Sequence, residues 1–279
     1  FVFAFELPDM ALRLLSCEDP RHSGFYAYLD YLNPERIPTL IHADERDTLI
    51  EALDAQRLSA RYRTNARELT FPFRALNRHG EWIWLEMNIH LSTGETKGTI
   101  GGIGYVKVIE DRKKLERKAT FDGLTQLLNR ATVEERVERH LAEEQEPCCL
   151  MIFDVDNFKN VNDLFGHLAG DTLLKDVAGV VRAHLRQTDI VGRLGGDEFV
   201  ALLRNATDEI AYDKGRELLA AISQLNCVEG REYNITVSIG FACAPRDGHT
   251  FMELYTAADH ALYAAKRQGK NRCCSVHDS

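Results

Sequence analysis

The alternation of apolar and polar residues in the first 109 positions is typical of half-buried strands interrupted by one helical stretch. Two short strands are expected at 1–7 and 10–15, helical segments at 25–56, and three longer strands at 69–76, 82–91 and 99–109. Pro34 and Pro38 must divide the helical stretch, because proline cannot continue a helix interior. The pattern predicts an α+β module with an antiparallel sheet.

The strand expected at 82–91 has two different faces, because successive side chains of a strand point to opposite sides. One face is aliphatic and consists of Ile83, Leu85, Met87, Ile89 and Leu91. The other consists of Trp82, Trp84, Glu86, Asn88 and His90. We expect the aliphatic face to line the interior, and the tryptophans to need cover from a partner surface or an N-terminal helix.

In the second half of the chain the pattern alternates between helical and strand periods. We expect helices at 125–144, 160–186 (one or two), 211–224 and 251–269, strands at 148–155, 233–244 and 272–276, and a hairpin at 190–203. This order predicts a βαββαβ sheet with helices on one face. Residues 110–121 are charged and good helix formers, and Leu115 and Ala119 are spaced as a narrow seam requires. We therefore expect a helical linker at 110–121 between domains at 1–109 and 122–279.

Length and charge narrow the class of protein. A chain of 279 residues favours two domains, and it lacks the run of about 18 apolar residues that a membrane-spanning helix needs. The net charge of −9 argues against nucleic acid as a partner. The chain opens at Phe1 rather than Met. We expect a cytoplasmic excerpt of a longer protein, in which a membrane segment could precede Phe1.

The seven cysteines lack the spacing of a disulfide framework or a zinc site, and their number is odd. Two adjacent pairs, at 148–149 and 273–274, account for four of them. We expect reduced thiols that fill the core of a cytosolic protein.

Acidic residues stand at the ends of two predicted strands. Asp197 and Glu198 follow a Gly-Gly step in the hairpin, whose tight turn would present them at its tip. Asp154 and Asp156 end the apolar run at 148–155. Neighbouring strand ends of this kind form a hard-oxygen cluster suited to Mg²⁺, which indicates metal-assisted phosphoryl or nucleotidyl transfer.

These motifs resemble the GGDEF family of diguanylate cyclases over about residues 118–275. The matching segments are Asp122-Gly123-Leu124-Thr125, Leu128-Asn129-Arg130, Asp154-Val155-Asp156-Asn157-Phe158-Lys159, Asn162-Asp163, Phe165-Gly166-His167, Gly170-Asp171, Arg193-Leu194-Gly195-Gly196-Asp197-Glu198-Phe199, Thr236-Val237-Ser238-Ile239-Gly240 and Ala261-Leu262-Tyr263-Ala264-Ala265-Lys266. The resemblance implies a palm-like nucleotidyl cyclase fold and the condensation of two GTP into cyclic di-GMP with release of two pyrophosphates, by a homodimer.

The resemblance also implies roles for individual residues. Asp154, Asp197 and the Val155 carbonyl would hold Mg²⁺, or Mn²⁺ in its place. Glu198 would support Asp197, which the family casts as proton acceptor, and Lys159 would stabilise charge on the transferring phosphate. Asn162 and Asp171 would read guanine, with His167 lining the same pocket. Lys266 and Lys270, four apart on the last expected helix, would reach the terminal phosphates. Arg186 and Asp189 form an RxxD motif with five residues between Asp189 and Gly195, where the family binds inhibitory product.

The first domain is similar to a PAS sensor, through His42-Ala43-Asp44-Glu45-Arg46, Arg78-His79-Gly80-Glu81-Trp82-Ile83-Trp84 and the segment from Gly101 to Lys113. The resemblance makes His42 a helix start rather than a haem ligand, and it leaves the PAS ligand unknown. In the family, the linker helix pairs with its twin in the dimer and carries the signal.

Two alternatives to an active cyclase stay open. One is a non-catalytic GTP or cyclic di-GMP receptor, which the loss of a motif acid would indicate, although none is lost. The other is a cyclase using another base, against which Asn162 and Asp171 argue. With no hydrolase domain after Ser279, we expect no degradation of cyclic di-GMP by this chain.

Overall fold

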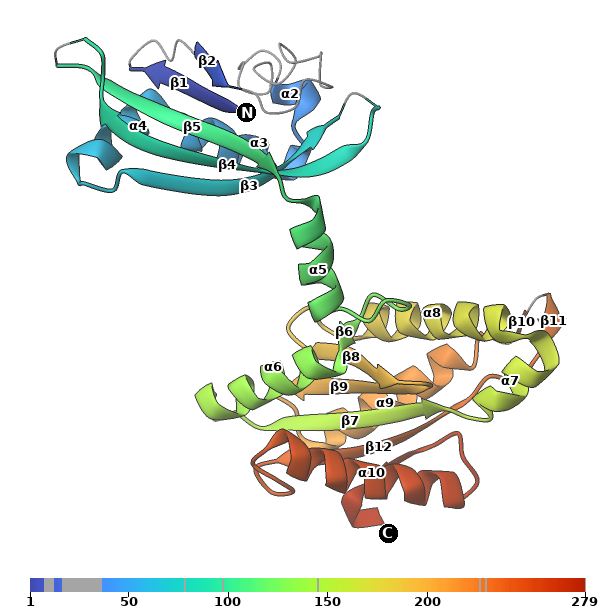
Figure 1. The fold of residues 1–279 in the computed structure, drawn as a ribbon. Coiled ribbons are helices and arrows are strands. Elements are labelled where there is room, and N and C mark those ends of the chain that lie inside the picture. Colours follow the sequence, from blue (N-terminus) through green and yellow to red (C-terminus); the bar gives the residue numbers. More distant parts are fainter. Residues whose placement is uncertain are drawn as a thin grey trace. The chain divides into compact units, whose positions relative to one another are not determined.

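The computed structural model describes residues 1–7, 13–16, 37–77, 79–96, 98–144, 146–225, 227–228 and 230–278. The chain divides into two compact units, Phe1–Leu115 and Glu116–Ser279 (Figure 1). Across the described ranges, no helix has both the length and the apolar character that crossing a bilayer requires.

The first unit is built on an antiparallel sheet with the strand order β2-β1-β5-β4-β3. Its strands are β1 (Val2–Glu6), β2 (Arg13–Ser16), β3 (Glu68–Leu76), β4 (Trp82–Thr93) and β5 (Ile100–Val108). Between β2 and β3 lie the short helices α2 (Ile37–Leu40), α3 (Ala43–Ala52) and α4 (Ala55–Arg63). Helices α3 and α4 pack against the apolar face of the sheet through Leu49 and Leu58 (Figure 1). The expected order of two strands, helices and three strands is confirmed. Parts of the second expected strand and of the expected helical stretch fall at 8–12 and 25–36, which lie outside the described residues.

Strand β4 has the two faces that its sequence predicts. Leu85, Met87 and Leu91 are almost fully buried in the core. The outward Trp84 is covered from within its own unit, because Arg74 and Lys113 each place a cation 5.2 Å from its ring centroid. Trp82, which is 44% exposed, meets the edge of His42. The expectation that the tryptophans need cover from a partner surface or an added helix is therefore wrong for Trp84.

Glycines on β5 make room for the aromatic side chains of β1. A Cβ on Gly102 would lie 2.4 Å from the Phe5 ring, and one on Gly104 would lie 2.2 Å from the Phe3 ring. Phe3 and Phe5 are both buried and lie across these glycines. The two rings thus lie over the β5 glycines on the buried face of the sheet.

The second unit contains a six-stranded mixed sheet in the order β13-β12-β7-β9-β8-β6. The strands are β6 (Leu128–Asn129), β7 (Cys148–Val155), β8 (Ile190–Gly195), β9 (Glu198–Arg204), β12 (Val237–Ala244) and β13 (Cys273–Ser275). The helices are α6 (Arg130–Glu143), α7 (Phe158–Phe165), α8 (His167–His184), α9 (Asp208–Ile222) and α10 (Phe251–Arg267). A small ribbon of β10 (Cys227–Val228) and β11 (Arg231–Glu232) follows α9, and η2 (Val276–Asp278) ends the described chain.

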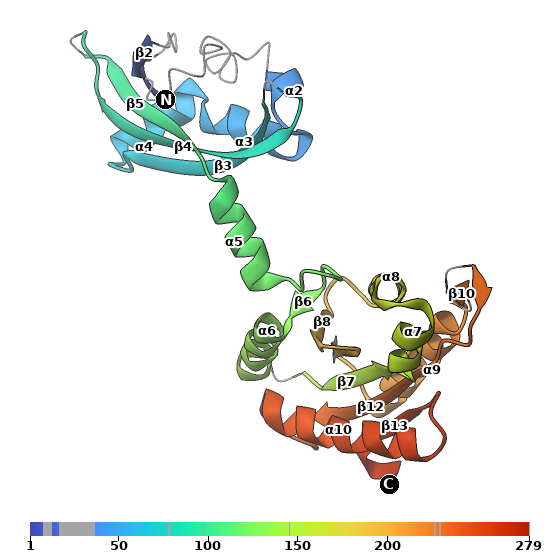
Figure 2. The ribbon, with the colours of Figure 1, turned by 45° about the vertical axis from the view of Figure 1, so that its right-hand side comes forward.

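Helices cover both faces of this sheet, so the expectation of helices on one face is wrong (Figure 2). Cys149, Met151 and Phe153 of β7 pack with α8 and α9. Leu150 and Ile152, which point the other way, pack with α6 and α10. A central strand buried on both sides has to be apolar at nearly every position, which is why β7 reads as a continuous apolar run.

A turn follows α5, in place of the helix expected from residue 125. Helix α5 (Glu110–Thr120) ends within one residue of the expected linker, and α6 begins only at Arg130. Asn129 caps α6 by accepting a hydrogen bond from the Thr132 backbone N–H at 3.0 Å. The Asn129 side-chain amide also donates to the Ala119 carbonyl at 2.7 Å. Asn129 therefore joins the end of α5 to the start of α6.

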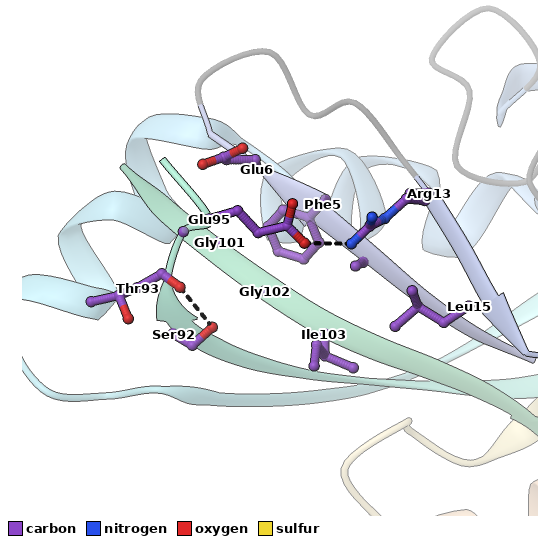
Figure 3. A pocket seen from close by; sticks show the side chains of 12 residues that line it. Phe5, Glu6, Arg13, Leu15, Ser92, Thr93, Glu95, Gly101, Gly102 and Ile103 are labelled. Carbon is purple, nitrogen blue, oxygen red and sulfur yellow. Dashed lines mark hydrogen bonds and ion pairs between the residues drawn. The ribbon is translucent and has the colours of Figure 1, made fainter. Parts of the chain in front are cut away.

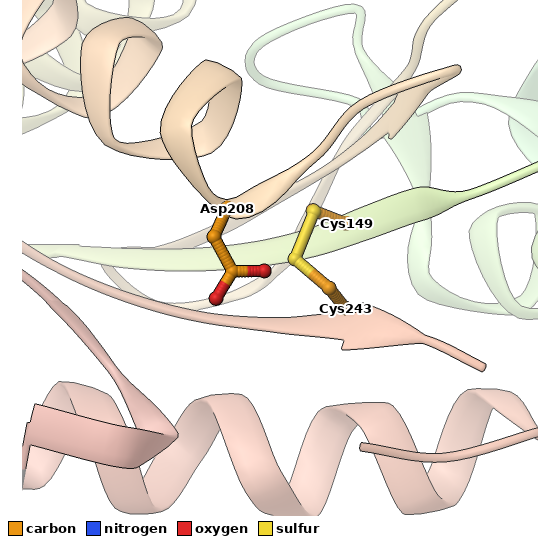
Figure 4. Close-up of side chains that lie close together, drawn as sticks. All are labelled: Cys149, Asp208 and Cys243. Atoms are coloured by element: carbon orange, nitrogen blue, oxygen red, sulfur yellow. A yellow bond between two sulfur atoms is a disulfide. The ribbon is translucent and has the colours of Figure 1, made fainter. Parts of the chain in front are cut away.

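Cys149 and Cys243 form a disulfide, which corrects the expectation that the cysteines are reduced (Figure 4). The two residues lie opposite each other on the antiparallel strands β7 and β12, with their Cα atoms 4.0 Å apart. The Asp208 carboxylate at the start of α9 lies within 4.8 Å of both sulfur atoms. Cys148, Cys273 and Cys274 are free thiols, as expected.

Candidate active site

The β8–β9 hairpin presents its two acids on a glycine turn. Gly195 and Gly196 have φ values of 147° and 54°, a region of backbone conformation that favours glycine. The Arg193 guanidinium donates from Nε and Nη2 to the Gly196 carbonyl at 3.0 and 2.6 Å. The turn that carries Asp197 and Glu198 is therefore held by a side chain of its own hairpin.

The end of β7 lies against the start of β9. Asp154 is the direct antiparallel partner of Glu198, and the Val155 N–H donates to the Asp197 carbonyl at 3.3 Å. Burial raises the pKa of Asp154 to about 6, opposed by the Lys266 hydrogen bond, with Asp197 and Glu198 adding to the increase. Three acids are thus close enough to repel one another, which is the arrangement that a bound cation relieves.

Lys266 supplies positive charge to this cluster in the structure. Its Nζ lies 2.9 Å from Asp154 Oδ1, and both side chains are at least partly shielded from solvent. Lys266 comes from the last turns of α10, which packs along β12 and β7. The helix therefore delivers a lysine to the same end of β7 as the carboxylates.

Asp156 does not join the acidic cluster, although the sequence predicted it there. Its side chain is 5% exposed and accepts hydrogen bonds of 2.7 Å from the hydroxyls of both Thr236 and Ser238. The Asn271 N–H donates to it as well, at 3.2 Å. Asp156 is thus a structural residue that ties the end of β7 to β12 and to the loop before β13.

Four of the residues proposed for the nucleotide site lie on α7 and α8. Lys159 is exposed on the first turn of α7, and Asn162 follows it on the same helix. Asn162 lies against Gly170 of α8, where a Cβ would be 2.0 Å from its Oδ1. Asp171 is the next residue, and it is exposed, as is His167 at the start of α8. The missing side chain at Gly170 is thus what lets Asn162 pack against α8 at the position before Asp171.

Lys270 is not on the last helix, because α10 ends at Arg267. It stands in the following loop with a positive φ of 63°. Its Nζ donates to Asn157 Oδ1 at 2.6 Å, and Asn157 precedes α7 in a left-handed conformation. Lys270 therefore reaches the site from the loop, and the expected shared helix face with Lys266 is wrong.

The RxxD motif lies at the turn between α8 and β8. Asp189 is 7% exposed, and its carboxylate accepts from the backbone N–H groups of Arg186 and Arg204 at 2.9 and 3.2 Å. The Arg186 side chain is exposed. Within the motif, Asp189 thus holds the turn and Arg186 faces solvent.

One residue pair at the site was not assigned a role from the sequence. Asp122 accepts hydrogen bonds from the Thr125 N–H and hydroxyl, and from Arg193 Nη1 at 3.0 Å. Burial would raise the pKa of Asp122, but the hydrogen bonds from Thr125 and Arg193 outweigh it and lower the pKa. The signal for this contact was the presence of both residues in family-like motifs, but their sequence separation hides the pairing.

The first unit has a surface pocket of about 380 Å³ (Figure 3). Leu15 and Ile103 line it, together with Arg13 and Glu95, whose exposed side chains form a 2.5 Å ion pair. His42 does not line this pocket: it caps α3 by accepting from the Asp44 N–H. That placement agrees with the expected helix start.

The comparison with family models matches residues 119–272 to "Diguanylate cyclase, GGDEF domain". The match covers more than half of the 279 residues and contains the hairpin, the end of β7 and helices α7 and α8. The second unit is thus an α+β domain of the nucleotidyl cyclase class, and the chain belongs to the GGDEF family.

Named relatives and solved structures resemble the same region. The bifunctional diguanylate cyclase/cyclic di-GMP phosphodiesterase MucR of Pseudomonas aeruginosa is 39% identical over 60% of this chain and 25% of its own length. A diguanylate cyclase of Vibrio cholerae is 32% identical over 68% of this chain and 60% of its own length. The coiled coil and GGDEF domain of DgcB from Caulobacter crescentus, solved with c-di-GMP, is 31% identical, with a TM-score of 0.55 over 60% of this chain and 90% of that one. The chain thus spans less than two thirds of the length of these two curated relatives.

Proposed function

We propose that the second unit is an active diguanylate cyclase that condenses two GTP into cyclic di-GMP and two pyrophosphates. The observation that carries the proposal is the pairing of Asp154 with Glu198, directly beside the glycine turn that presents Asp197. The family, and the relatives named as diguanylate cyclases, support the same activity. In each half-reaction a 3′-oxygen forms a bond to an α-phosphorus, and the bond from that phosphorus to the β-phosphate oxygen breaks.

Asp154, Asp197 and the Val155 carbonyl would hold a divalent metal, Mg²⁺ or alternatively Mn²⁺. Hard carboxylate and carbonyl oxygens suit these ions, and the raised pKa of Asp154 reflects its burial and the negative charge beside it. When bound, the metal supplies positive charge to the triphosphate. Glu198 supports it from the adjacent position, and Asp197 also stands where the family has a proton acceptor for the 3′-hydroxyl.

The remaining polar residues bind and orient GTP. Asn162 and Asp171 offer an amide and a carboxylate to the guanine edge, with His167 beside them. Lys266 and Lys270 bind the terminal phosphates. To do so, Lys266 gives up the contact that it makes with Asp154 in this structure. Lys159 offsets charge on the transferring phosphate. Positioning and charge stabilisation are the contributions expected for phosphoryl chemistry.

The chemistry requires two copies of the domain. Each copy holds one GTP, and each GTP attacks the α-phosphate of the other, so a twofold arrangement brings both sites together. The DgcB structure contains a coiled coil in addition to its GGDEF domain, which supports pairing through a helix outside the domain. We assign that role to α5, whose Leu115 is 67% exposed.

We assign the first unit as a PAS-like sensor of unknown ligand that controls the cyclase through α5. Its five-stranded antiparallel sheet, with helices inserted between the second and third strands, supports this assignment. A change in rotation or register of α5 would transmit the signal. We place these domains in the cytoplasm.

Product inhibition at the RxxD motif completes the proposed function. The exposed Arg186 can fork onto the guanine and phosphate of cyclic di-GMP. Asp189 keeps the turn in shape through its two backbone hydrogen bonds. Because this turn leads directly into β8, occupation there is well placed to affect the hairpin.

The assignment of the site is tested by GTP turnover in three variants. Asp197→Ala should abolish formation of cyclic di-GMP, whereas Asp176→Ala, an exposed acid on α8, should leave it unchanged. Asn162→Ala should raise the KM for GTP and reduce the preference for GTP over ATP. Normal turnover by Asp197→Ala would refute the site.

A further inference from the structure

Arg130 is a cation that has no role in the reaction as proposed so far. It is the first residue of α6, it is exposed, and its Cζ lies 5.8 Å from the centroid of the Tyr255 ring on α10. Within the described ranges it has no carboxylate partner. A positive charge at a helix N-terminus is unfavourable, so the side chain is not explained by its own helix.

The fold places Arg130 on the hairpin side of the site. The preceding residue, Asn129, pairs with Arg193 of β8, and Arg193 holds the Gly196 carbonyl. Burial raises the pKa of the Tyr255 hydroxyl, and the negative charges of Glu198 and Asp259 raise it further, while Arg130 lowers it. Tyr255 therefore lies near enough to Glu198 to feel its charge. The Arg130 guanidinium is thus stacked on an aromatic ring close to the acid that follows Asp197.

Arg130 contacts α10 at a different place from Lys266. Tyr255 and Lys266 are separated by eleven residues, or about 16 Å along the helix axis. We assign Lys266, which is bonded to Asp154, to the nucleotide held by its own domain, and this assignment leaves Arg130 for a second nucleotide.

We propose that Arg130, seated on Tyr255, contacts a phosphate of the GTP held by a second copy of the chain. This inference rests on the proposed diguanylate cyclase function and adds a residue that each copy contributes to the site of the other. Guanidinium forks bind phosphate oxygens with two parallel hydrogen bonds, and stacking on Tyr255 orders the side chain in advance. Loss of such a charge-assisted contact should slow turnover about tenfold or more.

Variants of the pair test whether the contact exists. Arg130→Ala should slow turnover about tenfold with little loss of thermal stability, while Arg136→Ala, an exposed arginine on the same helix, should behave as the wild type. Tyr255→Phe keeps the ring and should retain activity, and Tyr255→Leu should resemble Arg130→Ala. An Arg130→Ala protein that turns over like the wild type overturns the proposal.

Mixed dimers test which copy supplies the arginine. With Asp197→Ala in one copy only one phosphodiester bond can form, and the product is the linear dinucleotide pppGpG. If Arg130 acts across the dimer, a mixture of Arg130→Ala with Asp197→Ala should form pppGpG as fast as wild type mixed with Asp197→Ala. Wild type mixed with the double variant Arg130→Ala/Asp197→Ala should form it about tenfold more slowly.

The opposite order of rates in these two mixtures would mean that Arg130 serves its own nucleotide, and the proposal would be wrong. A wild-type chain that forms no product refutes the proposed function, and this inference with it. Product from the wild type with equal rates in both mixtures refutes the inference alone.

Discussion

Arg193 Nη1 donates to Asp122 Oδ1 over 3.0 Å, while Nη2 of the same side chain donates to the Gly196 carbonyl at 2.6 Å. One guanidinium therefore connects the turn that follows α5 with the glycine turn that presents Asp197. The Arg193 head group is largely shielded, since the side chain is 11% exposed. The position of the acids thus depends on the first turn of the domain as well as on the hairpin itself.

Replacing Arg193 should damage catalysis more than folding. Arg193→Ala removes both donors to Gly196, and a small displacement of the turn is enough to lower turnover about tenfold to a hundredfold. Steady-state kinetics, together with amide hydrogen exchange at residues 195–198, would measure both effects. Full activity with unchanged exchange at residues 195–198 would show that Arg193 does not position the acids.

The raised pKa of Asp154 predicts an acidic limit to activity. Asp154 must be ionised to hold a metal, so at limiting Mg²⁺ the value of kcat/KM should fall as the pH falls through about 6. The free energy of unfolding of the metal-free protein should instead increase as the pH falls through this range. Because the native state binds more protons than the unfolded chain between the ordinary pKa of 3.8 and about 6, the free energy of unfolding decreases as the pH rises through this window.

Urea unfolding of metal-free protein at several pH values would measure that slope. Asp154→Asn should remove it while abolishing turnover. An identical slope in the variant would assign the proton to another group.

Lys266 should lower the pKa of Asp154 and thereby set the pH at which activity is lost. Its hydrogen bond lowers the pKa of Asp154, so Lys266→Met should move the acidic limit of kcat/KM to higher pH as well as weakening GTP binding. Arg267→Met is the matched control, because Arg267 stacks on Tyr263 rather than contacting Asp154. A pH profile of turnover for both variants decides the matter, and an unmoved acidic limit in Lys266→Met would contradict the pairing.

The two residues of the RxxD motif should differ in what they do. Arg186→Ala should relieve inhibition by cyclic di-GMP and leave initial turnover intact. Asp189→Ala should instead lower the free energy of unfolding by about 1–3 kcal/mol, because it leaves two backbone N–H groups without their acceptor. Product-inhibition curves and urea denaturation separate the two effects, with Arg182→Ala as control. Unchanged inhibition in Arg186→Ala would remove the feedback role.

Local patterns predicted most of the elements that build the site. The apolar run of β7 and the Gly-Gly step between β8 and β9 were enough to anticipate a strand beside a hairpin. The same run also carried a signal that was missed, since a strand that is apolar at successive positions must be covered on both faces. The sequence alone therefore predicted the strand but not the placement of its helices.

Other features depend on contacts that sequence patterns do not reveal. The pairing of Cys149 with Cys243 requires the register of two strands whose cysteines are 94 residues apart. The withdrawal of Asp156 from the acidic cluster depends on hydroxyls from Thr236 and Ser238. The end of α10 before Lys270 did carry a local signal that was missed, since Gly269, with a φ of 115°, directly follows the C-cap Gln268.

The conversion of GTP by the purified chain tests the central claim most directly. The chain is incubated with GTP and Mg²⁺, products are resolved by chromatography, and GTP binding and cross-linked dimers are measured in the same samples. We predict cyclic di-GMP from the intact chain and none from Asp197→Ala. A chain that binds GTP and dimerises, yet forms no cyclic di-GMP, would contradict the cyclase function and identify a receptor instead.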